Sequence, residues 1–266
     1  ITFARHPQTV MGRKEPLGMI TTNPQKLRLF EKIGIRRTLL VPFNKNFSRI
    51  SPEAFVEDIL LKKLVMRELC VGYDFAFGRD RKGNIELLRA LARRHGFRLK
   101  IFGPYRSAGT VVSSTLIRGF LSKGELAKAA KFLGRPYSME GSVERGLGLG
   151  KSLGFATANL RMANDCLLPE GVYAVMAKGA GFQRPGVLNA GYRPTIKPQG
   201  KKAGKTKTWE LHIWDFHKQL YGKQLEIFFI KRLRPEKKFP SLAALSAQIG
   251  RDVENAKQVV KAYKAL

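Results

Sequence analysis

The sequence is poor in the residues that build metal centres and disulfide frameworks. It contains only two cysteines, Cys70 and Cys166, and four histidines among 266 residues. No Cys-x-x-Cys pair and no histidine cluster occurs, so the sequence does not support a zinc site. Each cysteine stands in an apolar stretch, and we therefore expect two buried free thiols in a reducing compartment.

Long hydrophobic runs are also missing. No apolar run approaches the ~18 residues that a membrane-spanning helix needs, and nothing resembles a secretory leader. We therefore expect a cytoplasmic protein with no membrane association. The sequence starts at Ile1 without a methionine, and Ile1–Phe3 already resembles a strand, so we expect it to begin inside a domain.

Acidic residues are scarce, at 20 Asp and Glu against 49 Lys and Arg, which gives a net charge of +29. Such a charge attracts polyanions, and it suits nucleic acid and nucleotide ligands equally. The one basic cluster, Lys197–Lys207, has no interleaved aromatic side chains on which bases could stack, which favours a solvated loop. No specific nucleic-acid partner is therefore expected, and the oligomeric state is not predicted.

The order of strand-like and helix-like segments changes near Gly134. Before it, apolar strands alternate with amphipathic helices, which predicts a parallel sheet in an α/β domain. After it, short strands and glycine-rich turns continue to about Leu242, which predicts an antiparallel β-barrel closed by C-terminal helices. We therefore expect two domains, residues 1–134 and residues 135–266. The expected strands are 38–43, 68–71, 98–102, 139–144, 172–177, 208–214 and 224–230, and the expected helices include 23–33, 52–64, 86–95, 114–122 and 125–133.

The glycine-rich segment Gly146–Ser152 is the most conspicuous local motif. Its spacing does not match a Walker-type phosphate loop, because Arg145 stands where that loop needs its first glycine. Glycines still let backbone N–H groups approach an anion, and Lys151 adds a positive charge. A phosphate-binding loop and an ordinary flexible hairpin therefore both remain open.

Three further segments carry candidate site residues. On the expected strand at 208–214, alternation places Glu210 on one face with His212 and Trp214, where it is either a general base or a solvated residue. A helix expected from Ser114 carries hydroxyls and Arg118 at its start, which indicates either an anion site or an ordinary cap. The loop Gly72–Arg81, which includes Asp74, follows a strand of the expected parallel sheet, where such sheets bind ligands.

Taken in order, these segments resemble the bifunctional bacterial riboflavin kinases/FMN adenylyltransferases, also called FAD synthetases. The resemblance covers nearly the whole chain and is most specific after Gly134. The matching pieces are Thr2-Phe3, His6-Pro7, Gly72–Gly78, Ser113–Thr115, Arg118, Leu133–Tyr137, Gly141–Val143, Gly146, Gly150, Leu153–Phe155, Thr157–Asn159, Leu168-Pro169, Gly171–Ala174, Asn189–Thr195, Glu210, Asp215-Phe216, Leu220–Gly222, Arg234–Glu236 and Phe239.

The resemblance implies a nucleotidyltransferase-like (Rossmann-like) α/β domain followed by a riboflavin kinase barrel. The kinase would convert riboflavin and ATP to FMN, with Glu210 as the base. Thr157 and Asn159 would bind Mg²⁺ and the ATP phosphates. The remaining implied residues are Gly146, Gly148, Gly150 and Lys151 for phosphate binding, Asn189, Arg193, Arg234 and Phe239 for flavin binding, and Asp74, Ser113, Ser114, Thr115 and Arg118 for the adenylyltransferase site.

The sequence departs from the family pattern at two places. Ala156 stands where the family has proline, which implies a looser backbone beside the metal site. The family's two-histidine motif would precede Ile1 and is absent, so FMN adenylylation is expected of a longer chain and not of the sequence as written. The alternatives are a basic nucleic-acid-binding protein, or a flavin-binding protein on a degenerate enzyme scaffold, without catalysis.

Overall fold

A computed structural model shows two compact units, unit 1 with Ile1–Leu17 and Leu27–Val112, and unit 2 with Gly18–Lys26 and Ser113–Leu266. It describes residues 1–4, 18–145, 154–164, 167–194, 205–216 and 218–264. None of the helices in these ranges is both long and apolar enough to cross a bilayer.

Unit 1 contains two parallel strand pairs, as expected for an α/β domain. Strand β1 (Thr2–Phe3) pairs with β2 (Leu40–Val41), and β3 (Glu68–Gly72) pairs with β4 (Arg98–Phe102). Helix α5 (Ile85–His95) connects β3 to β4; the Asn84 side chain caps its start, and Gly96 ends it in the left-handed conformation. The other elements are α3 (Lys45–Ser48), α4 (Pro52–Ala54), the π-helical segment η1 (Phe55–Lys63), η2 (Arg79–Arg81), and the hairpin β5 (Arg106–Ser107) and β6 (Thr110–Val111).

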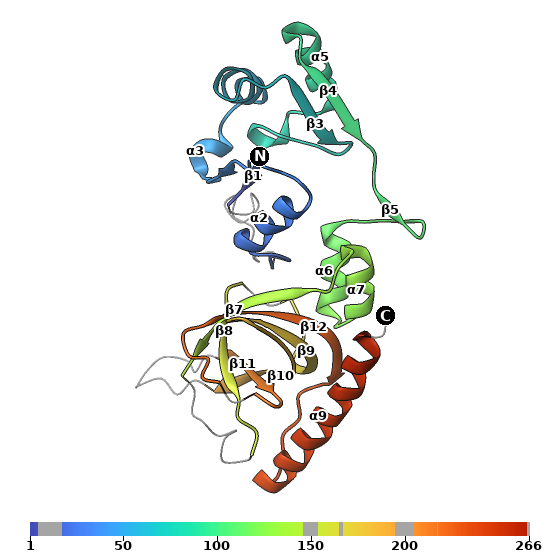
Figure 1. Cartoon of the computed structure of the whole chain (residues 1–266). Helices are drawn as coiled ribbons and strands as arrows, with labels where there is room; N and C mark the ends of the chain where they lie inside the picture. The colour runs from blue at the N-terminus through green and yellow to red at the C-terminus, as the bar shows by residue number, and fades with distance from the viewer. Residues whose placement is uncertain (5–17, 146–153, 165–166, 195–204, 217, 265–266) are drawn as a thin grey trace. The chain divides into compact units, whose positions relative to one another are not determined.

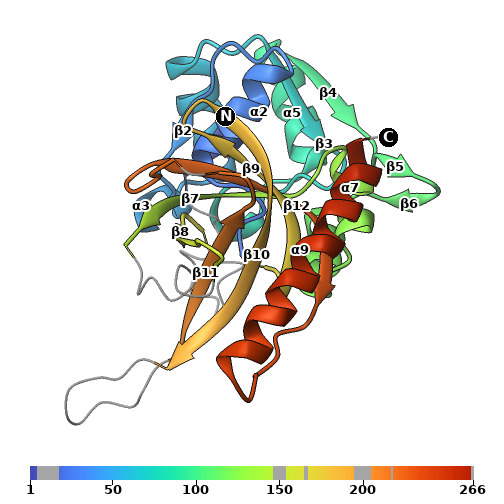
Figure 2. The ribbon, with the colours of Figure 1, turned by 60° about the horizontal axis from the view of Figure 1, so that its bottom comes forward.

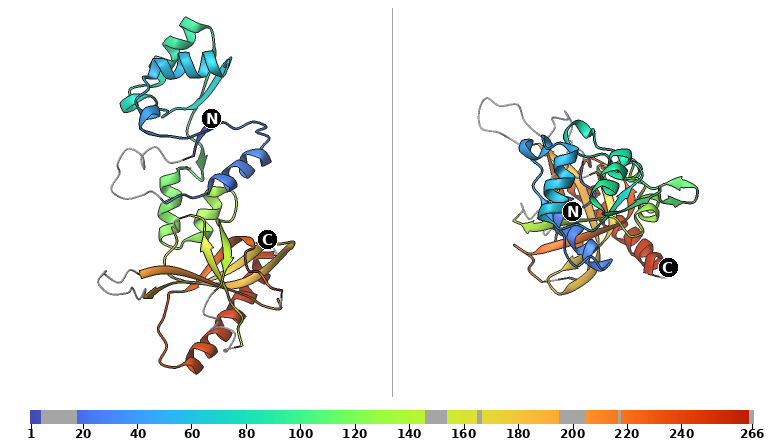
Figure 3. Two further views of the ribbon diagram at one scale, coloured as in Figure 1. Left: turned by 90° about the vertical axis from the view of Figure 1, so that its left-hand side faces the viewer. Right: turned by 90° about the horizontal axis from the view of Figure 1, so that it is seen from above.

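The core of unit 1 forms where helices cover the β3–β4 pair. Val56 and Leu60 of η1 are buried in one cluster with Leu88 and Leu91 of α5 and Val71 of β3. Both helices adjoin the strand pair in Figure 3. The expectation of a buried Cys70 was wrong, because Cys70 is exposed. Alternation along β3 places it on the face opposite Val71, with its Sγ 3.8 Å from Glu68 Oε1. Cys166 lies outside the described residues.

Unit 2 contains a closed antiparallel barrel, and helices stand before and after it in the chain (Figure 1). Around the barrel the strands follow the order β10, β11, β8, β7, β12, β9. Inward side chains, among them Tyr173, Leu188, Leu211 and Phe229, are fully buried. The elements are α6 (Ser114–Ser122), α7 (Leu126–Leu133), β7 (Ser138–Glu144), β8 (Ala158–Met162), β9 (Gly171–Gly179), β10 (Phe182–Pro194), β11 (Lys205–Ile213), β12 (Gln224–Arg234) and α9 (Leu242–Lys264).

Helix α9 packs against the outer face of the barrel. Its residues Val253 and Ala256 are buried against Val172 of β9 and Val187 of β10. Figure 2 shows the helix lying along β10 and β12. A closed barrel with a C-terminal helix is the predicted architecture, with one helix in the described residues where several were expected. The boundary between residues 134 and 135 stays a prediction.

A short upstream segment completes unit 2. Helix α2 (Asn23–Lys32) begins in this segment, and Gln25 is only 3% exposed. The Gln25 side-chain amide donates to Ser138 Oγ at 3.2 Å and to Glu226 Oε1 at 3.3 Å. The Thr22 hydroxyl donates to Glu140 Oε2 at 2.8 Å. Residues more than a hundred positions upstream of β7 are therefore hydrogen-bonded into the barrel wall.

Candidate active site

The strand register aligns several of the sequence-predicted site residues in one row across the barrel. Asn159 on β8 lies opposite Glu210 on β11, and Glu210 lies opposite Asn189 on β10. The row continues to Glu144 on β7 on one side, and through Val172 on β9 to Arg234 on β12 on the other. Residues directly opposite in an antiparallel ladder share a face with Cβ atoms about 4.5–5.5 Å apart. The fold therefore brings Asn159, Glu210 and Asn189 side by side.

This row lies on the outer face of the barrel. The alternating residues Trp209, Leu211 and Ile213 of β11 are buried in the interior, so Glu210, His212 and Trp214 point outwards. Trp214 packs on the cluster beneath α9, whereas Glu210 and Asn159 are half-buried. The predicted base is thus held on a rigid strand and remains accessible to a substrate.

The segment that leads into β8 is held by a contact from β11. A nitrogen of the His212 ring, Nδ1, lies 2.9 Å from the backbone oxygen of Ala156. The Phe155 ring meets the His212 ring edge to face, with centroids 5.4 Å apart at 85°. Thr157 follows directly and borders a pocket of about 210 Å³ at the barrel mouth. Its lining includes Ala158, Leu211, Leu220 and Tyr221.

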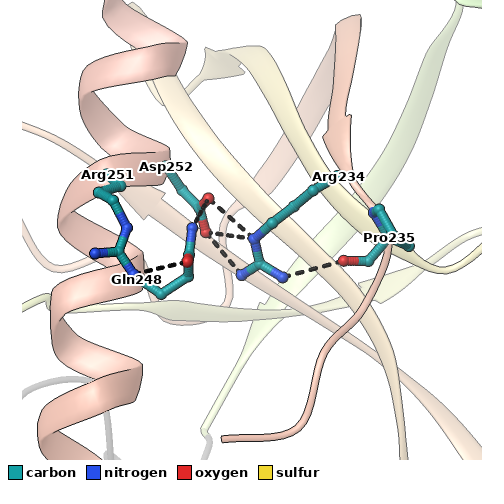
Figure 4. Close-up of polar contacts among 5 residues, drawn as sticks. All are labelled: Arg234, Pro235, Gln248, Arg251 and Asp252. Carbon is teal, nitrogen blue, oxygen red and sulfur yellow. Dashed lines mark hydrogen bonds and ion pairs between the residues drawn. The ribbon is translucent and has the colours of Figure 1, made fainter.

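Arg234 is held by an acidic residue of α9. Its Nη2 donates to Asp252 Oδ2 at 2.7 Å, its Nε donates to both carboxylate oxygens at 3.0 Å, and its Nη1 donates to the Pro235 carbonyl (Figure 4). Asp252 is 3% exposed and also accepts a bond from Gln248. The Phe239 ring lies 5.6 Å from the guanidinium carbon. Arg234 therefore ties β12 to α9 and supports Phe239, the other predicted flavin-binding residue of this segment.

A carboxyl pair lies just beyond Arg234. Burial, followed by a hydrogen bond to Glu170, raises the pKa of Glu236 above its ordinary value of 4.5. The backbone N–H of Tyr192 donates to the same carboxyl group, and Arg234 is a nearby positive charge; both oppose the shift. Gly191 stands where any side chain would collide with Glu236.

The predicted adenylyltransferase residues are divided between the two units. Asp74 is exposed in the loop after β3 in unit 1. Ser113 caps α6 in unit 2, where its Oγ accepts from Leu116 N at 3.2 Å, and Ser114 and Thr115 are exposed on the first turn. Arg118 Nε donates to the Gly18 carbonyl at 2.9 Å. Ser113 thus acts as the helix cap that was the alternative interpretation.

An aromatic pocket in unit 1 was not predicted. Its volume is about 170 Å³. The Phe75 and Phe77 rings stack at 5.4 Å and 17°, and Phe47 meets Phe55 edge to face at 6.1 Å. Arg81 supplies positive charge at the wall, which is lined by Phe3, Phe43, Phe47, Ser48, Ile50, Phe55, Phe75, Ala76, Phe77, Gly78 and Arg81. The phenylalanines alone could have suggested it, but they come from five separate segments.

Some predicted residues are not placed. Gly146, Gly148, Gly150 and Lys151 lie outside the described residues, and Arg193 is placed on β10 by its backbone alone. In the described part of the chain, no group of three His, Cys, Asp or Glu side chains could hold a metal ion. Magnesium in phosphoryl-transfer enzymes is held mostly by substrate phosphates and water, with one or two protein ligands. The few oxygen-bearing side chains around Asn159 fit that kind of site.

Comparison with known proteins gives matches over nearly the whole length. A family model described as riboflavin kinase matches residues 133–260, and one described as FAD synthetase matches residues 1–116. The chain is 34% identical to the bifunctional riboflavin kinase/FMN adenylyltransferase of Escherichia coli K12 over 96% of its length and 80% of the relative's. The protein of that name from Listeria monocytogenes is 32% identical over 97% and 80%. A solved Streptococcus pneumoniae structure described as a macrolide-efflux protein shares the fold, with a TM-score of 0.82 and 24% identity over 96% of this chain and 81% of that one.

Proposed function

Because this chain belongs to the bifunctional riboflavin kinase/FMN adenylyltransferase family, we propose that its barrel transfers the γ-phosphoryl group of ATP to the 5′-hydroxyl of riboflavin, forming FMN and ADP. The observation that carries this proposal is the ladder row of Asn159, Glu210 and Asn189. The kinase is assigned to residues 135–266 and the adenylyltransferase to residues 1–134. The row gives no support to a non-catalytic binding protein.

Glu210 is the proposed base. Its carboxylate accepts the proton of the riboflavin 5′-hydroxyl as the oxygen attacks the γ-phosphorus, and the bond to the β-phosphate oxygen breaks. The outer face of β11 holds the carboxylate half-buried, so it can reach a bound hydroxyl. Asn189 lies beside it and is placed to orient the flavin side of the substrate.

Thr157 and Asn159 are the proposed ligands on the ATP side. Magnesium bound with ATP would neutralise charge on the phosphates. The hydroxyl of Thr157 and the amide oxygen of Asn159 would hold it, and the ladder places Asn159 directly next to the base. Phosphoryl transfer depends mainly on such positioning, because the transition state needs aligned groups and compensated charge.

The test is FMN production by wild-type protein and by Glu210→Gln, followed by chromatography. The substitution keeps the size of the side chain and removes the base, so turnover should fall ~10²–10⁴-fold with the fold unchanged. Asn159→Ala should instead raise the KM for MgATP. Glu254→Gln, an exposed carboxylate on α9 paired with Lys257, is the control and should be neutral. Near-normal turnover by Glu210→Gln would show that Glu210 is not the base.

For the second activity, FMN plus ATP to FAD and diphosphate, we propose that the flavin ring binds in the aromatic pocket of unit 1. Stacked and edge-on phenylalanines offer flat apolar surfaces to a tricyclic ring, and Arg81 offers a charge to the phosphate. Calorimetric titration with FMN should find one site fewer in Phe75→Ala than in wild type. Phe102→Ala, an exposed ring on β4 in the same unit, is the control. An unchanged number of sites in Phe75→Ala contradicts the assignment.

A further inference from the structure

A side-chain contact lies where the backbone ladder between β11 and β8 stops. Strand β11 pairs with β8 at Glu210–Asn159 and at Leu211–Ala158. The next residue of β11 is His212. The Nδ1 atom of its ring lies 2.9 Å from the carbonyl oxygen of Ala156, just before β8. The His212 side chain therefore links β11 to the segment before β8, one residue of β11 beyond the last ladder pair.

The chemistry of this contact fixes the state of the histidine ring. A carbonyl oxygen is an acceptor only, so Nδ1 must carry the hydrogen. The ring is also held by Phe155, whose edge-on contact at 5.4 Å joins it to the apolar cluster beneath α9. Because one side chain is fixed by a hydrogen bond and by an aromatic contact, it makes a stiff support.

Thr157 lies between two anchored residues. The Ala156 carbonyl on one side is held by His212, and Ala158 on the other side is held by the ladder. We infer that His212 is a positioning residue, which fixes the Thr157 backbone so that its hydroxyl meets the magnesium-bound phosphates of ATP. This inference rests on the proposed kinase function. His212 takes no part in the chemistry and acts through the backbone of its neighbour.

The first test separates the hydrogen bond from the aromatic contact. His212→Phe keeps a ring for Phe155 and removes the donor, whereas the side-chain amide of His212→Asn can place a donor close to the position of Nδ1. We expect the KM for MgATP to rise about 2- to 12-fold in His212→Phe, the equivalent of one lost hydrogen bond. The kcat and the KM for riboflavin should change less, and His212→Asn should restore most of the loss. His95→Phe, a histidine on α5 in unit 1, is the control.

A second measurement does not depend on activity. In ligand-free protein, amide hydrogen exchange of peptides covering 155–160 should be faster in His212→Phe than in wild type, with the other barrel strands unchanged. An unchanged KM for MgATP, a loss confined to kcat, or faster exchange throughout the barrel would each overturn the inference. Wild-type protein that makes no FMN would instead refute the proposed function, while the exchange result would still decide whether His212 anchors the segment.

Discussion

At the scale of single residues, the surroundings of Glu236 determine how its contribution to stability changes with pH. Its pKa is raised by burial and by the neighbouring Glu170. A carboxyl whose pKa is higher in the folded than in the unfolded protein binds its proton more tightly when folded. It therefore contributes stability that is complete below pH 4.5 and is lost as the pH rises through the raised value.

Glu236→Gln should remove this dependence. The amide keeps an oxygen for the Tyr192 N–H and cannot ionise, so the variant should gain stability relative to wild type as the pH rises above 4.5. Thermal unfolding of both proteins from pH 4 to pH 8 measures the difference, and Glu31→Gln, an exposed residue of α2, is the control. A constant difference across this range would contradict the assigned direction. The effect should be small, because Glu236 is an exposed residue whose carboxyl group is only partly shielded, so that water screens its interactions.

At the scale of elements, the positions of most helices and strands could be predicted. The expected strand 98–102 and the helix 114–122 have the observed bounds, because propensity, caps and periodicity agree there. Strand β10 was missed, since Pro185, Gly186 and Gly191 are turn signals in a sequence. Gly186 is needed because a Cβ there would lie 2.6 Å from the His212 carbonyl oxygen. The π-helical segment at 55–63 was expected as part of an ordinary helix.

The site was predictable only as a set of residue types. Thr157, Asn159 and Glu210 could be proposed from the family resemblance, but neither alternation nor spacing says which strand pairs with which. The ladder row depends on register, which is fixed by pairing between residues as distant in the sequence as Asn159 and Glu210, or Val172 and Arg234. The Arg234–Asp252 pair was missed for the same reason, since Asp252 belongs to a helix whose docking no local pattern reveals.

Asp252→Asn should destabilise unit 2 strongly. The Arg234 side chain is 20% exposed and that of Asp252 only 4%, so the substitution leaves a buried guanidinium without its counter-charge, at a cost of about 3–5 kcal/mol. Asp58→Asn is the matched control, because its partner Lys62 and Asp58 itself are exposed by 73% and 54%; it should change stability by less than about 1 kcal/mol. Urea unfolding monitored by circular dichroism compares them. Similar midpoints for the two variants would show that the buried pair contributes little.

At the scale of the whole molecule, unit 2 contains more of the chain than residues 135–266, to which the kinase is assigned. Unit 2 also contains α6, α7 and Gly18–Lys26. Helix α7 packs on β12, and its Leu126 and Ala129 are buried. Among the described residues, however, the interior of the barrel is filled from Tyr137 onwards, and ~130 residues can sustain a core.

A fragment of residues 135–266 should therefore fold, but with less stability than a fragment of residues 113–266. Losing the apolar cover of α6 and α7 should cost on the order of 2–4 kcal/mol, about one or two buried leucines. Denaturant unfolding of the two fragments tests this, and FMN formation reports whether each keeps its site. Should the shorter fragment be unfolded while the longer is folded, the helices belong to the kinase domain and the boundary near residue 134 is wrong.

The short pairing between β8 and β11 has a consequence for how the enzyme would lose activity on heating. Strands β10 and β11 are zipped by nine consecutive ladder pairs, whereas the described pairing of β8 with β11 comprises two. Local opening starts where the fewest backbone bonds must break, and here that seam carries both Asn159 and Glu210. Warming would separate Asn159 from the proposed base Glu210 while the remaining strands stay paired. Activity would then be lost below the melting temperature, because the β8–β11 pairing would open reversibly before the protein unfolds.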